Sequence, residues 1–344
     1  MTVKLALIGT GSMGQKHAAA ILAAPEAHLC ASVDPAGPIP SAANTTHFSE
    51  FSQFMAAITT IKPDGVILAT PNQAHKDQAI ALLKAGIPVL IEKPIADTVE
   101  AGRAIAEASE KSGVPALVGH HRRYNGRLRQ AKALIDQGAI GDVVAVAATW
   151  ITHKPDAYFD VLWRRAVGGG PILINLIHDI DSLIFLLGSI TTVQAMTSSR
   201  QRSFDIEDSA AILLRFQSGI LATVTVSDAA LSPWSWEHTA DEPTARSYPQ
   251  SGQDCYYITG RDGALAVPSL TLWRSTADRD WQAPLQSETI HADNPDPFPL
   301  QLQHFTDIIK SNKSPIVSAA DGLQTLRVIE AIQEAAVTKS AVNL

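Results

Sequence analysis

The first 120 residues alternate between short apolar segments and helix-like segments, and this alternation limits the fold more than any other feature of the chain. The short segments are apolar throughout, which is typical of strands covered on both faces. Strands and helices in regular succession predict right-handed βαβ units around a parallel, doubly wound sheet. The expected strands are Val3–Ile8, His28–Val33, Gly65–Ala69, Pro88–Glu92 and Pro115–Gly119, and the expected helices are Ser12–Ala24, Phe48–Thr60, Gln73–Ala85 and Thr98–Lys111.

The pattern changes after residue 120, where strand-like and helix-like segments no longer alternate regularly. The segments expected there are a helix at Arg127–Gln137, a strand at Val143–Trp150, a hairpin of Ala210–Phe216 and Ile220–Val226, and helices at 298–312 and 319–338. We therefore predict an α/β fold with two domains. Residues 1–121 form a Rossmann doubly wound parallel sheet, and residues 122–344 form an α+β domain with a mainly antiparallel open sheet.

Composition limits the partners of the chain. It has 344 residues, 46% of them hydrophobic, and a net charge of −7, which suits two well-packed domains and argues against a nucleic acid or a membrane surface as partner. No apolar stretch is long enough to cross a bilayer, and Val3–Ile8 is too short for a signal peptide. Cys30 and Cys255 lack metal-type spacing, so we expect a cytoplasmic protein without a metal.

Three glycines follow the first expected strand, in the stretch LALIGTGSMGQKH at residues 5–17. In a dinucleotide-binding βαβ unit, Gly9 permits the tight turn, Gly11 lets the backbone approach a pyrophosphate, and Gly14 lets helix and strand pack closely. Asp34 lies 20 residues after Gly14, where a carboxylate binds the ribose hydroxyls of NAD. Because Pro-Ala-Gly follows Asp34, with no arginine for a 2′-phosphate, NAD is favoured over NADP. The predicted contacts in this region are Gly9, Gly11, Ser12, Met13, Gly14 and Asp34.

Lys93 stands at the end of an expected strand, where ligands collect in open α/β sheets, although a lysine there can also simply point to solvent. With its neighbours it forms the motif Glu92-Lys93-Pro94. Together with other motifs in the same order, this motif resembles the glucose–fructose oxidoreductase / inositol dehydrogenase (Gfo/Idh/MocA) family. The other motifs are the glycine turn, Ala69-Thr70-Pro71-Asn72, Val118-Gly-His-His-Arg-Arg-Tyr, Trp163-Arg164, the triple glycine leading to His178-x-x-Asp181, and Asp321-Gly-Leu.

The resemblance implies an NAD-dependent oxidoreductase that transfers hydride between nicotinamide and a secondary alcohol carbon of a sugar, polyol or related cyclic substrate. It implies that Lys93 contacts the reacting hydroxyl and the nicotinamide ribose, that His178 is the general acid/base, and that the chain is a homodimer or homotetramer joined through the open sheet. The further cofactor contacts it implies are Thr70, Pro71, Asn72, His75, Glu92, Lys93 and Arg164. The substrate contacts it implies are Lys93, Arg123, Tyr124, Trp163, Asn175 and His178.

The helix expected over residues 171–188 carries His178 opposite a wide apolar face, beside Asn175, Asp181 and Ser182. Family dehydrogenases commonly have an Asp or Asn four residues before this histidine, but here the position is Ile174. Asn175 lies about 100° further round an α-helix, so the same role cannot be assumed for it. Asp181 and Asp179 are the two alternatives for orienting the imidazole.

Several alternatives stay open at the level of sequence. The missing acid at position 174 permits a cis-dihydrodiol as substrate, and the fold also resembles a dinucleotide-binding transcriptional regulator without activity. The Arg122-Arg123-Tyr124 segment suits either a cleft or a surface basic cluster, and Trp163 suits either a ligand contact or the core. Trp234 and Trp236, in the long excursion over 228–253, suit a cover over substrate or a subunit contact.

Overall fold

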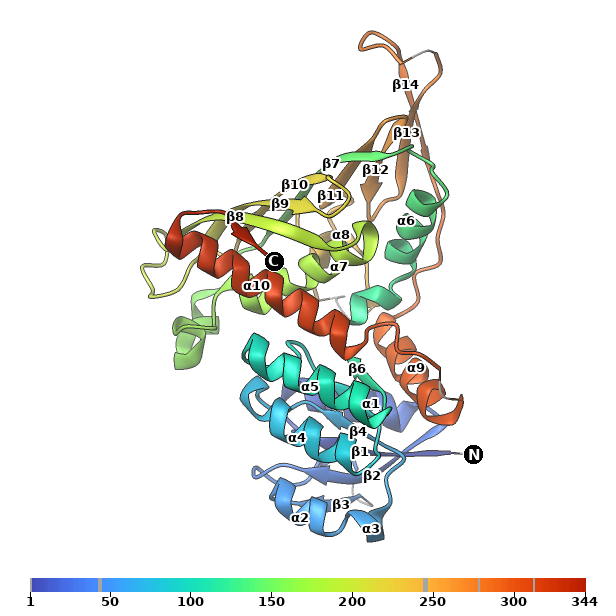
Figure 1. Ribbon diagram of the computed structural model, residues 1–344, viewed down its shortest axis with the longest axis vertical. Helices are drawn as coiled ribbons and strands as arrows, with labels where there is room; N and C mark the ends of the chain where they lie inside the picture. The colour runs from blue at the N-terminus through green and yellow to red at the C-terminus, as the bar shows by residue number, and fades with distance from the viewer. Residues whose placement is uncertain (1, 43–44, 244–246, 278, 312) are drawn as a thin grey trace. The chain divides into compact units, whose positions relative to one another are not determined.

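The computed structural model describes residues 2–42, 45–243, 247–277, 279–311 and 313–344 (Figure 1). The chain forms two compact units. Unit 1 contains Met1–His121 and Phe298–Leu326, and unit 2 contains Arg122–Pro297 and Arg327–Leu344. Residues 298–326, which we expected in the second domain, thus pack with the first 121 residues.

Unit 1 is built on a parallel sheet with the strand order β3-β2-β1-β4-β5-β6. Its strands are β1 (Val3–Ile8), β2 (Ala27–Val33), β3 (Thr46–Phe48), β4 (Gly65–Leu68), β5 (Val89–Ile91) and β6 (Ala116–Val118). Its helices are α1 (Ser12–Ala23), α2 (Phe51–Ala56), α3 (Ile58–Ile61), α4 (Asn72–Lys84), α5 (Val99–Ser112) and α9 (Pro297–Ser311), together with the start of α10 (Ala319–Thr338). The strands β1, β4, β5 and β6 are almost fully buried, which is why they read as continuous apolar runs.

The strand order reverses next to β1, because β2 lies on one side of it and β4 on the other. In open parallel sheets a ligand binds at the carboxyl ends of the strands at such a reversal. The segments after β1 and β4 meet there, since the amide of Ala69 donates to the carbonyl of Ile8 at 2.7 Å. The fold therefore places the glycine turn and the Thr70 segment side by side.

Unit 2 is built on a sheet with the strand order β14-β13-β12-β11-β7-β10-β9-β8-β15. Its strands are β7 (Val143–Ile151), β8 (Ile190–Ser198), β9 (Ser209–Phe216), β10 (Leu221–Ser227), β11 (Tyr256–Gly260), β12 (Gly263–Val267), β13 (Thr271–Ser275), β14 (Leu285–Thr289) and β15 (Val342–Asn343). All described pairs are antiparallel except β7 with β10.

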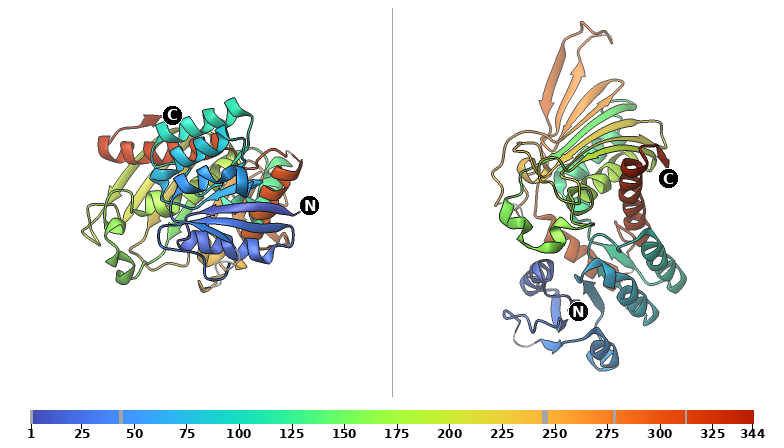
Figure 2. Two further views of the ribbon diagram at one scale, coloured as in Figure 1. Left: turned by 90° about the horizontal axis from the view of Figure 1, so that it is seen from below. Right: turned by 90° about the vertical axis from the view of Figure 1, so that its left-hand side faces the viewer.

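Within the described residues, helices cover one face of this sheet and leave the other bare (Figure 2). The helical elements of unit 2 are α6 (Gly126–Asp136), α7 (Ile177–Leu187), α8 (Trp236–Thr239), the later part of α10, three short 3₁₀ turns (His121–Tyr124, Asp156–Asp160 and Leu162–Arg165) and a π-helical turn (Ile172–Leu176). One hydrophobic core joins α6, α7 and α10 to the inward side chains of the sheet. Strands β9 and β10 alternate between buried and exposed residues, as expected for a sheet with one covered face.

Three local expectations differ from the structure. The short edge strand β3 was not expected, and the helix expected over Phe48–Thr60 begins at Phe51 and is divided into α2 and α3 at Ala57. The single α-helix expected over residues 171–188 begins with the π-turn. A π-turn has a wider repeat than an α-helix, so the angle between Asn175 and position 174 is somewhat smaller there than the 100° of an α-helix, but the two side chains still point in different directions. The expected fold class, a Rossmann sheet followed by a mainly antiparallel sheet, is confirmed.

Candidate functional site

The glycine turn of unit 1 shows a different structural reason for each glycine. Gly9 has a φ of +89°, and a Cβ on it would lie 2.5 Å from the carbonyl oxygen of Ala69. A Cβ on Gly14 would lie 2.0 Å from the carbonyl oxygen of Gly9. A Cβ on Gly11 would meet no protein atom within 4 Å among the described residues. Packing therefore explains Gly9 and Gly14, whereas Gly11 leaves open space in front of the first turn of α1.

The first turn of α1 begins at Ser12, and among the described residues no side chain caps it. The backbone N–H groups of a helix start are anion-binding groups, and an uncapped start leaves them available. Ser12 is exposed and Met13 half-buried beside the open space. The turn fits the pyrophosphate of a dinucleotide.

Asp34 follows β2, and its carboxylate is held by two backbone amides. Thr10, inside the glycine turn, donates to Oδ2 at 2.7 Å, and Ala36 donates to Oδ1 at 2.8 Å. Burial alone would raise the pKa of Asp34, but these backbone bonds more than offset it and hold the pKa below its ordinary value. An ionised carboxylate has further acceptor capacity on both oxygens, so Asp34 can accept from ribose hydroxyls while it stays anchored.

Lys93 follows β5 in a loop whose preceding residue is tightly held. Glu92 is 6% exposed, and its Oε1 lies 2.7 Å from Nε2 of His17 on α1. Its Oε2 accepts from the backbone N–H of Lys93 at 3.2 Å. Burial alone would raise the pKa of Glu92, but the hydrogen bond from His17 more than offsets it, so the pKa is lowered and Glu92 is a carboxylate. Lys93 itself is half-buried.

His75 on α4 was expected to bind cofactor, but the structure gives its ring backbone partners. The side chain is 1% exposed, with Nδ1 3.1 Å from the carbonyl oxygen of Pro94 and Nε2 3.0 Å from that of Thr70. Burial holds the pKa of His75 below its ordinary value. The neighbouring Pro71 is exposed and Asn72 half-buried at the start of α4. Thr70 is half-buried as well, so these three residues are accessible where His75 is not.

In unit 2 the glycine run before His178 is a point where three segments meet. A Cβ on Gly169 would lie 2.6 Å from the carbonyl oxygen of Trp163, and one on Gly170 would lie 2.2 Å from Oε1 of Glu207. The same Glu207 oxygen accepts from the backbone N–H of Ile172 at 3.0 Å, at the start of the π-turn. The glycines thus allow the helix bearing His178 to begin against the Trp163 segment and Glu207.

Trp163 and Arg164 lie in a 3₁₀ turn before these glycines. The indole of Trp163 is 53% exposed, which excludes the core alternative for it. The guanidinium of Arg164 lies over the ring of Tyr158, 4.1 Å from its centroid, and donates to the Tyr158 carbonyl oxygen at 2.8 Å. This contact fixes Arg164 beside Trp163, whose ring centroid is 5.5 Å away.

His178 is half-buried in the first turn of α7, and two buried carboxylates, Asp179 and Asp181, follow it on the same helix. Asp179 accepts from Arg122 Nη1 at 3.0 Å and from the Tyr256 hydroxyl at 2.5 Å. Arg122 also donates to Glu237 at 2.8 Å. Burial raises the pKa of Asp179 to about 6. Burial alone would lower the pKa of Arg122, but Asp179 and Glu237 raise it, so the guanidinium stays charged.

The second carboxylate, Asp181, forms a bidentate pair with Arg123. Nε donates to Oδ2 at 2.9 Å and Nη2 to Oδ1 at 2.8 Å, with Asp181 fully buried and Arg123 5% exposed. Arg122, Arg123 and Tyr124 are all buried, so this segment is no surface basic cluster. The two arginines hold α7 from the 3₁₀ turn His121–Tyr124, a role that was not predicted from the sequence.

Asn175 lies in the π-turn, and its Oδ1 is buried without a hydrogen-bond partner among the described residues. A buried acceptor of this kind is costly unless something donates to it. Trp236, in the 228–253 segment, is 1% exposed and stacks on Tyr256, which makes it a core residue of unit 2, whereas Trp234 is 44% exposed. Residues 244–246 of that segment lie outside the described part of the chain.

In unit 1 the structure thus places the expected cofactor residues along one edge of the parallel sheet. Thr10 donates to Asp34, Gly9 packs closely against Ala69, and the ring of His75 contacts the Thr70 carbonyl oxygen. The structure adds His17, which the sequence analysis passed over. Its position was a usable signal, because His17 falls three residues after Gly14 and shares the buried side of α1 with Ala18 and Ile21. A histidine on a buried helix face needs a partner.

Two features of the described residues bear on a membrane or a metal as partner. In the described part of the chain, no helix is both long and apolar enough to span a membrane. Within the same residues, no three His, Cys, Asp or Glu side chains are grouped as a metal site would require. The expected cytoplasmic location stays a prediction.

Comparison with known proteins identifies the family. Residues 3–120 match the family model described as "Oxidoreductase family, NAD-binding Rossmann fold". Residues 128–266 match the family model described as "GFO/IDH/MocA C-terminal domain". The chain is 28% identical over 284 residues to 1,5-anhydro-D-fructose reductase of Ensifer adhaerens, which covers 82% of this chain and 80% of that protein. It is 30% identical over 233 residues to inositol 2-dehydrogenase 2 of Saccharopolyspora erythraea, and the match covers 66% of this chain and 67% of that protein.

A solved structure shares the fold over the full length. The WlbA dehydrogenase of Bordetella pertussis, in complex with NADH and UDP-GlcNAcA, has a TM-score of 0.77 and 24% identity, covering 100% of this chain and 99% of that chain. The resemblance expected from the motifs is therefore confirmed. This chain belongs to the Gfo/Idh/MocA family of oxidoreductases, with an NAD-binding Rossmann domain.

Proposed function

We propose that this protein is an NAD-dependent dehydrogenase that oxidises a secondary alcohol of a sugar, polyol or related cyclic compound, or reduces the matching ketone. The observation that carries the proposal is the edge of unit 1, where the glycine turn, the anchored carboxylate of Asp34 and the Lys93 loop follow strands β1, β2 and β5 of one parallel sheet. The named activities of the relatives, on an inositol and on an anhydro-sugar, support the substrate class.

Each residue has a separate task in this proposal. Bound NAD would supply the hydride acceptor at C4 of its nicotinamide. Lys93 binds the alcohol oxygen and stabilises negative charge on it. His178 accepts the hydroxyl proton, a task suited to a group that titrates near neutral pH. The substrate hydroxyls next to the reacting carbon are bound by Asn175, whose buried Oδ1 needs a donor, and by Trp163, while Arg164 contacts the cofactor.

We also propose NAD over NADP as cofactor. Asp34 carries a negative charge at the position that meets the adenosine ribose, and its two backbone bonds prevent the carboxylate from turning away. A 2′-phosphate there would place like charges together. Pro35, Ala36 and Gly37 follow, none of which can neutralise a phosphate.

The test is NADH formation with a panel of inositols, free sugars, anhydro-sugar alcohols and cis-dihydrodiols. Lys93→Ala and His178→Ala should each lower kcat by at least about 10²-fold on any substrate that reacts, while the Kd of NADH changes little. Lys132→Ala and His28→Ala are the matched controls, because Lys132 lies in an exposed helical ion pair and His28 is exposed on β2. Both controls should keep normal turnover.

Two outcomes would redirect the proposal. NADH binding without turnover of any panel member would favour the non-catalytic regulator, and turnover restricted to dihydrodiols would move the substrate class to flatter, less polar rings. Normal turnover in Lys93→Ala or His178→Ala would remove that residue from the mechanism.

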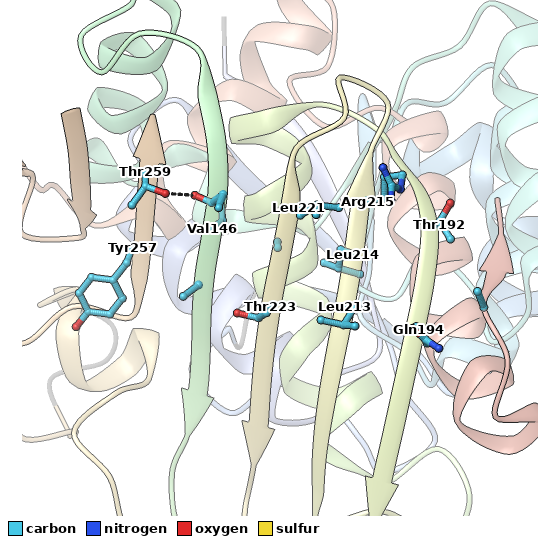
Figure 3. A pocket seen from close by; sticks show the side chains of 14 residues that line it. Val146, Thr192, Gln194, Leu213, Leu214, Arg215, Leu221, Thr223, Tyr257 and Thr259 are labelled. Atoms are coloured by element: carbon cyan, nitrogen blue, oxygen red, sulfur yellow. Dashed lines mark hydrogen bonds between the residues drawn. The ribbon is translucent and has the colours of Figure 1, made fainter. Parts of the chain in front are cut away.

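We infer further that the protein is a homo-oligomer joined through the bare face of the unit 2 sheet. Thr223, Leu213 and Gln194 project on this face from the neighbouring strands β10, β9 and β8 (Figure 3). The face also exposes large apolar side chains: Leu213 is 52% exposed, Leu221 50%, Met196 78% and Tyr257 43%. A contiguous apolar patch of this kind is typical of a protein interface.

Sedimentation velocity tests the inference. The unaltered chain should sediment as a dimer or tetramer, and Leu213→Glu with Leu221→Glu should give monomers. Leu22→Glu is the matched control, since Leu22 is equally exposed, at 50%, but lies on α1 of unit 1. A monomeric unaltered chain, or an oligomer that survives both glutamates, would contradict the inference.

A further inference from the structure

The residues on both sides of Lys93 are held by buried histidines from two different helices. His17 on α1 contacts the side chain of Glu92, and His75 on α4 contacts the carbonyl oxygen of Pro94. Both imidazoles are nearly inaccessible, at 2% and 1% exposure.

The His17 contact has a defined direction. Because the pKa of Glu92 is lowered, its carboxylate is ionised and can only accept hydrogen bonds, so Nε2 of His17 carries the proton and donates. The carboxylate fits closely, since a Cβ on Gly119 would lie 3.1 Å from Oε2. Oε2 in turn accepts from the backbone N–H of Lys93. A continuous chain of hydrogen bonds therefore runs from His17 to the backbone of Lys93.

The His75 contact joins two loops. Its nitrogens face the carbonyl oxygens of Pro94 and Thr70, and each of its neutral tautomers donates to one of them. Thr70 belongs to the segment after β4, and Pro94 follows Lys93. The helices that carry the histidines begin at the glycine turn and at Asn72, the two helix starts expected to face the cofactor.

We propose that His17 and His75 are positioning residues that hold the Lys93 loop and fix its ammonium group relative to the cofactor. The proposal rests on the proposed function in taking Lys93 as a group that contacts substrate. Each histidine acts through a neighbour of Lys93, and neither touches the reacting atoms. A cofactor seated on the starts of α1 and α4 is thereby linked to the lysine through the same two helices.

The central test compares two replacements of His17. His17→Phe keeps a ring against Phe298, whose centroid lies 4.7 Å away, but removes the donor. His17→Gln keeps a donor near the position of Nε2. In hydrogen–deuterium exchange with mass spectrometry, peptides over residues 89–97 should exchange about tenfold faster in His17→Phe, since a hydrogen bond to a charged group is lost. His17→Gln should stay within about twofold of the unaltered protein.

Turnover and cofactor binding complete the test. His17→Phe should lower kcat about tenfold on any panel substrate and leave the Kd of NADH within about twofold, whereas His17→Gln should recover most of kcat. His28→Phe is the control, because His28 is exposed on β2 of the same unit. If no panel substrate reacts, only the proposed dehydrogenase activity is contradicted. The hydrogen–deuterium exchange rates still test whether His17 holds the Lys93 loop.

Two results would overturn the proposal. One is an unchanged exchange rate over residues 89–97 in folded His17→Phe, and the other is equal behaviour of His17→Phe and His17→Gln. If His17→Phe does not fold, His75→Leu tests the second contact in the same peptides, with a rise of about fivefold expected and an unchanged rate contradicting it.

Discussion

Removal of Arg123 should destabilise unit 2 far more than removal of an exposed charge. Asp181 is fully buried, and Arg123 makes two hydrogen bonds to it at 2.8 and 2.9 Å. In Arg123→Met this carboxylate stays buried and loses its cation. Breaking a buried pair from one side costs about 3–5 kcal/mol in the free energy of unfolding. We expect a loss in that range, with a fall in kcat because the Arg123 pair holds the helix that carries His178.

The assay is urea unfolding followed by tryptophan fluorescence. All six tryptophans lie between residues 150 and 281, within unit 2, so the fluorescence reports on the unfolding of that unit. Lys132→Ala is the matched control, because its partner Asp136 lies one turn away on an exposed face. An exposed pair of this type contributes about 0.3–0.5 kcal/mol.

A double-mutant cycle separates the pair from the packing of its members. Arg123→Met with Asp181→Leu removes both charges, so the double variant should cost at least about 2 kcal/mol less than the sum of the two single variants. The reasoning is refuted if Arg123→Met costs no more than Lys132→Ala. It is also refuted if the double variant costs as much as the sum.

Three further predictions concern unit 1. Gly14→Ala should destabilise the unit by about 1–3 kcal/mol in thermal unfolding, because its Cβ would lie 2.0 Å from a backbone oxygen. Gly11→Ala should keep the stability of the unit but raise the Kd of NADH at least about tenfold. Equal effects of the two substitutions would contradict this prediction. Asp34→Ala should raise the Kd of NADH about tenfold and that of NADPH less, as measured by nucleotide fluorescence titration; an unchanged ratio would contradict it. Burial lowers the pKa of His75 from 6.5, so as the pH falls the unfolded chain binds a proton before the folded chain does, and stability is lost below about pH 6.5. His75→Leu should therefore show a smaller loss of melting temperature between about pH 7.5 and about pH 5.5 than the unaltered protein. The same loss in both proteins would count against this assignment.

The local elements of the fold were predictable because their signals are local. The strand Val3–Ile8 has the predicted bounds, and α10 covers the predicted residues 319–338. The hairpin of β9 and β10 follows from alternation and a glycine turn. Edge strand β3 has only three residues, too few for a periodic pattern to appear. The π-turn before α7 has no sequence signal of its own, since it depends on how Glu207 and the glycine run meet.

The candidate site was only partly predictable for a similar reason. The glycine turn and Asp34 are read from spacing, because one βαβ unit places them. The contacts of His17 with Glu92 and of Arg122 with Asp179 join residues 75 and 57 positions apart. Tertiary packing brings such residues together, and a single sequence does not reveal which buried polar groups will pair. Spacing therefore indicates which residues are expected to border the site, but not which residues hold them in place.

The account depends on Lys93 and His178 acting on one alcohol beside one nicotinamide ring. A crystal structure of the protein with NAD and a panel alcohol that reacts tests this most directly. We predict Nζ of Lys93 and a ring nitrogen of His178 within about 2.6–3.2 Å of the same hydroxyl oxygen, with the nicotinamide C4 facing its carbon. A bound alcohol that contacts neither side chain, or only one of them, would contradict the account.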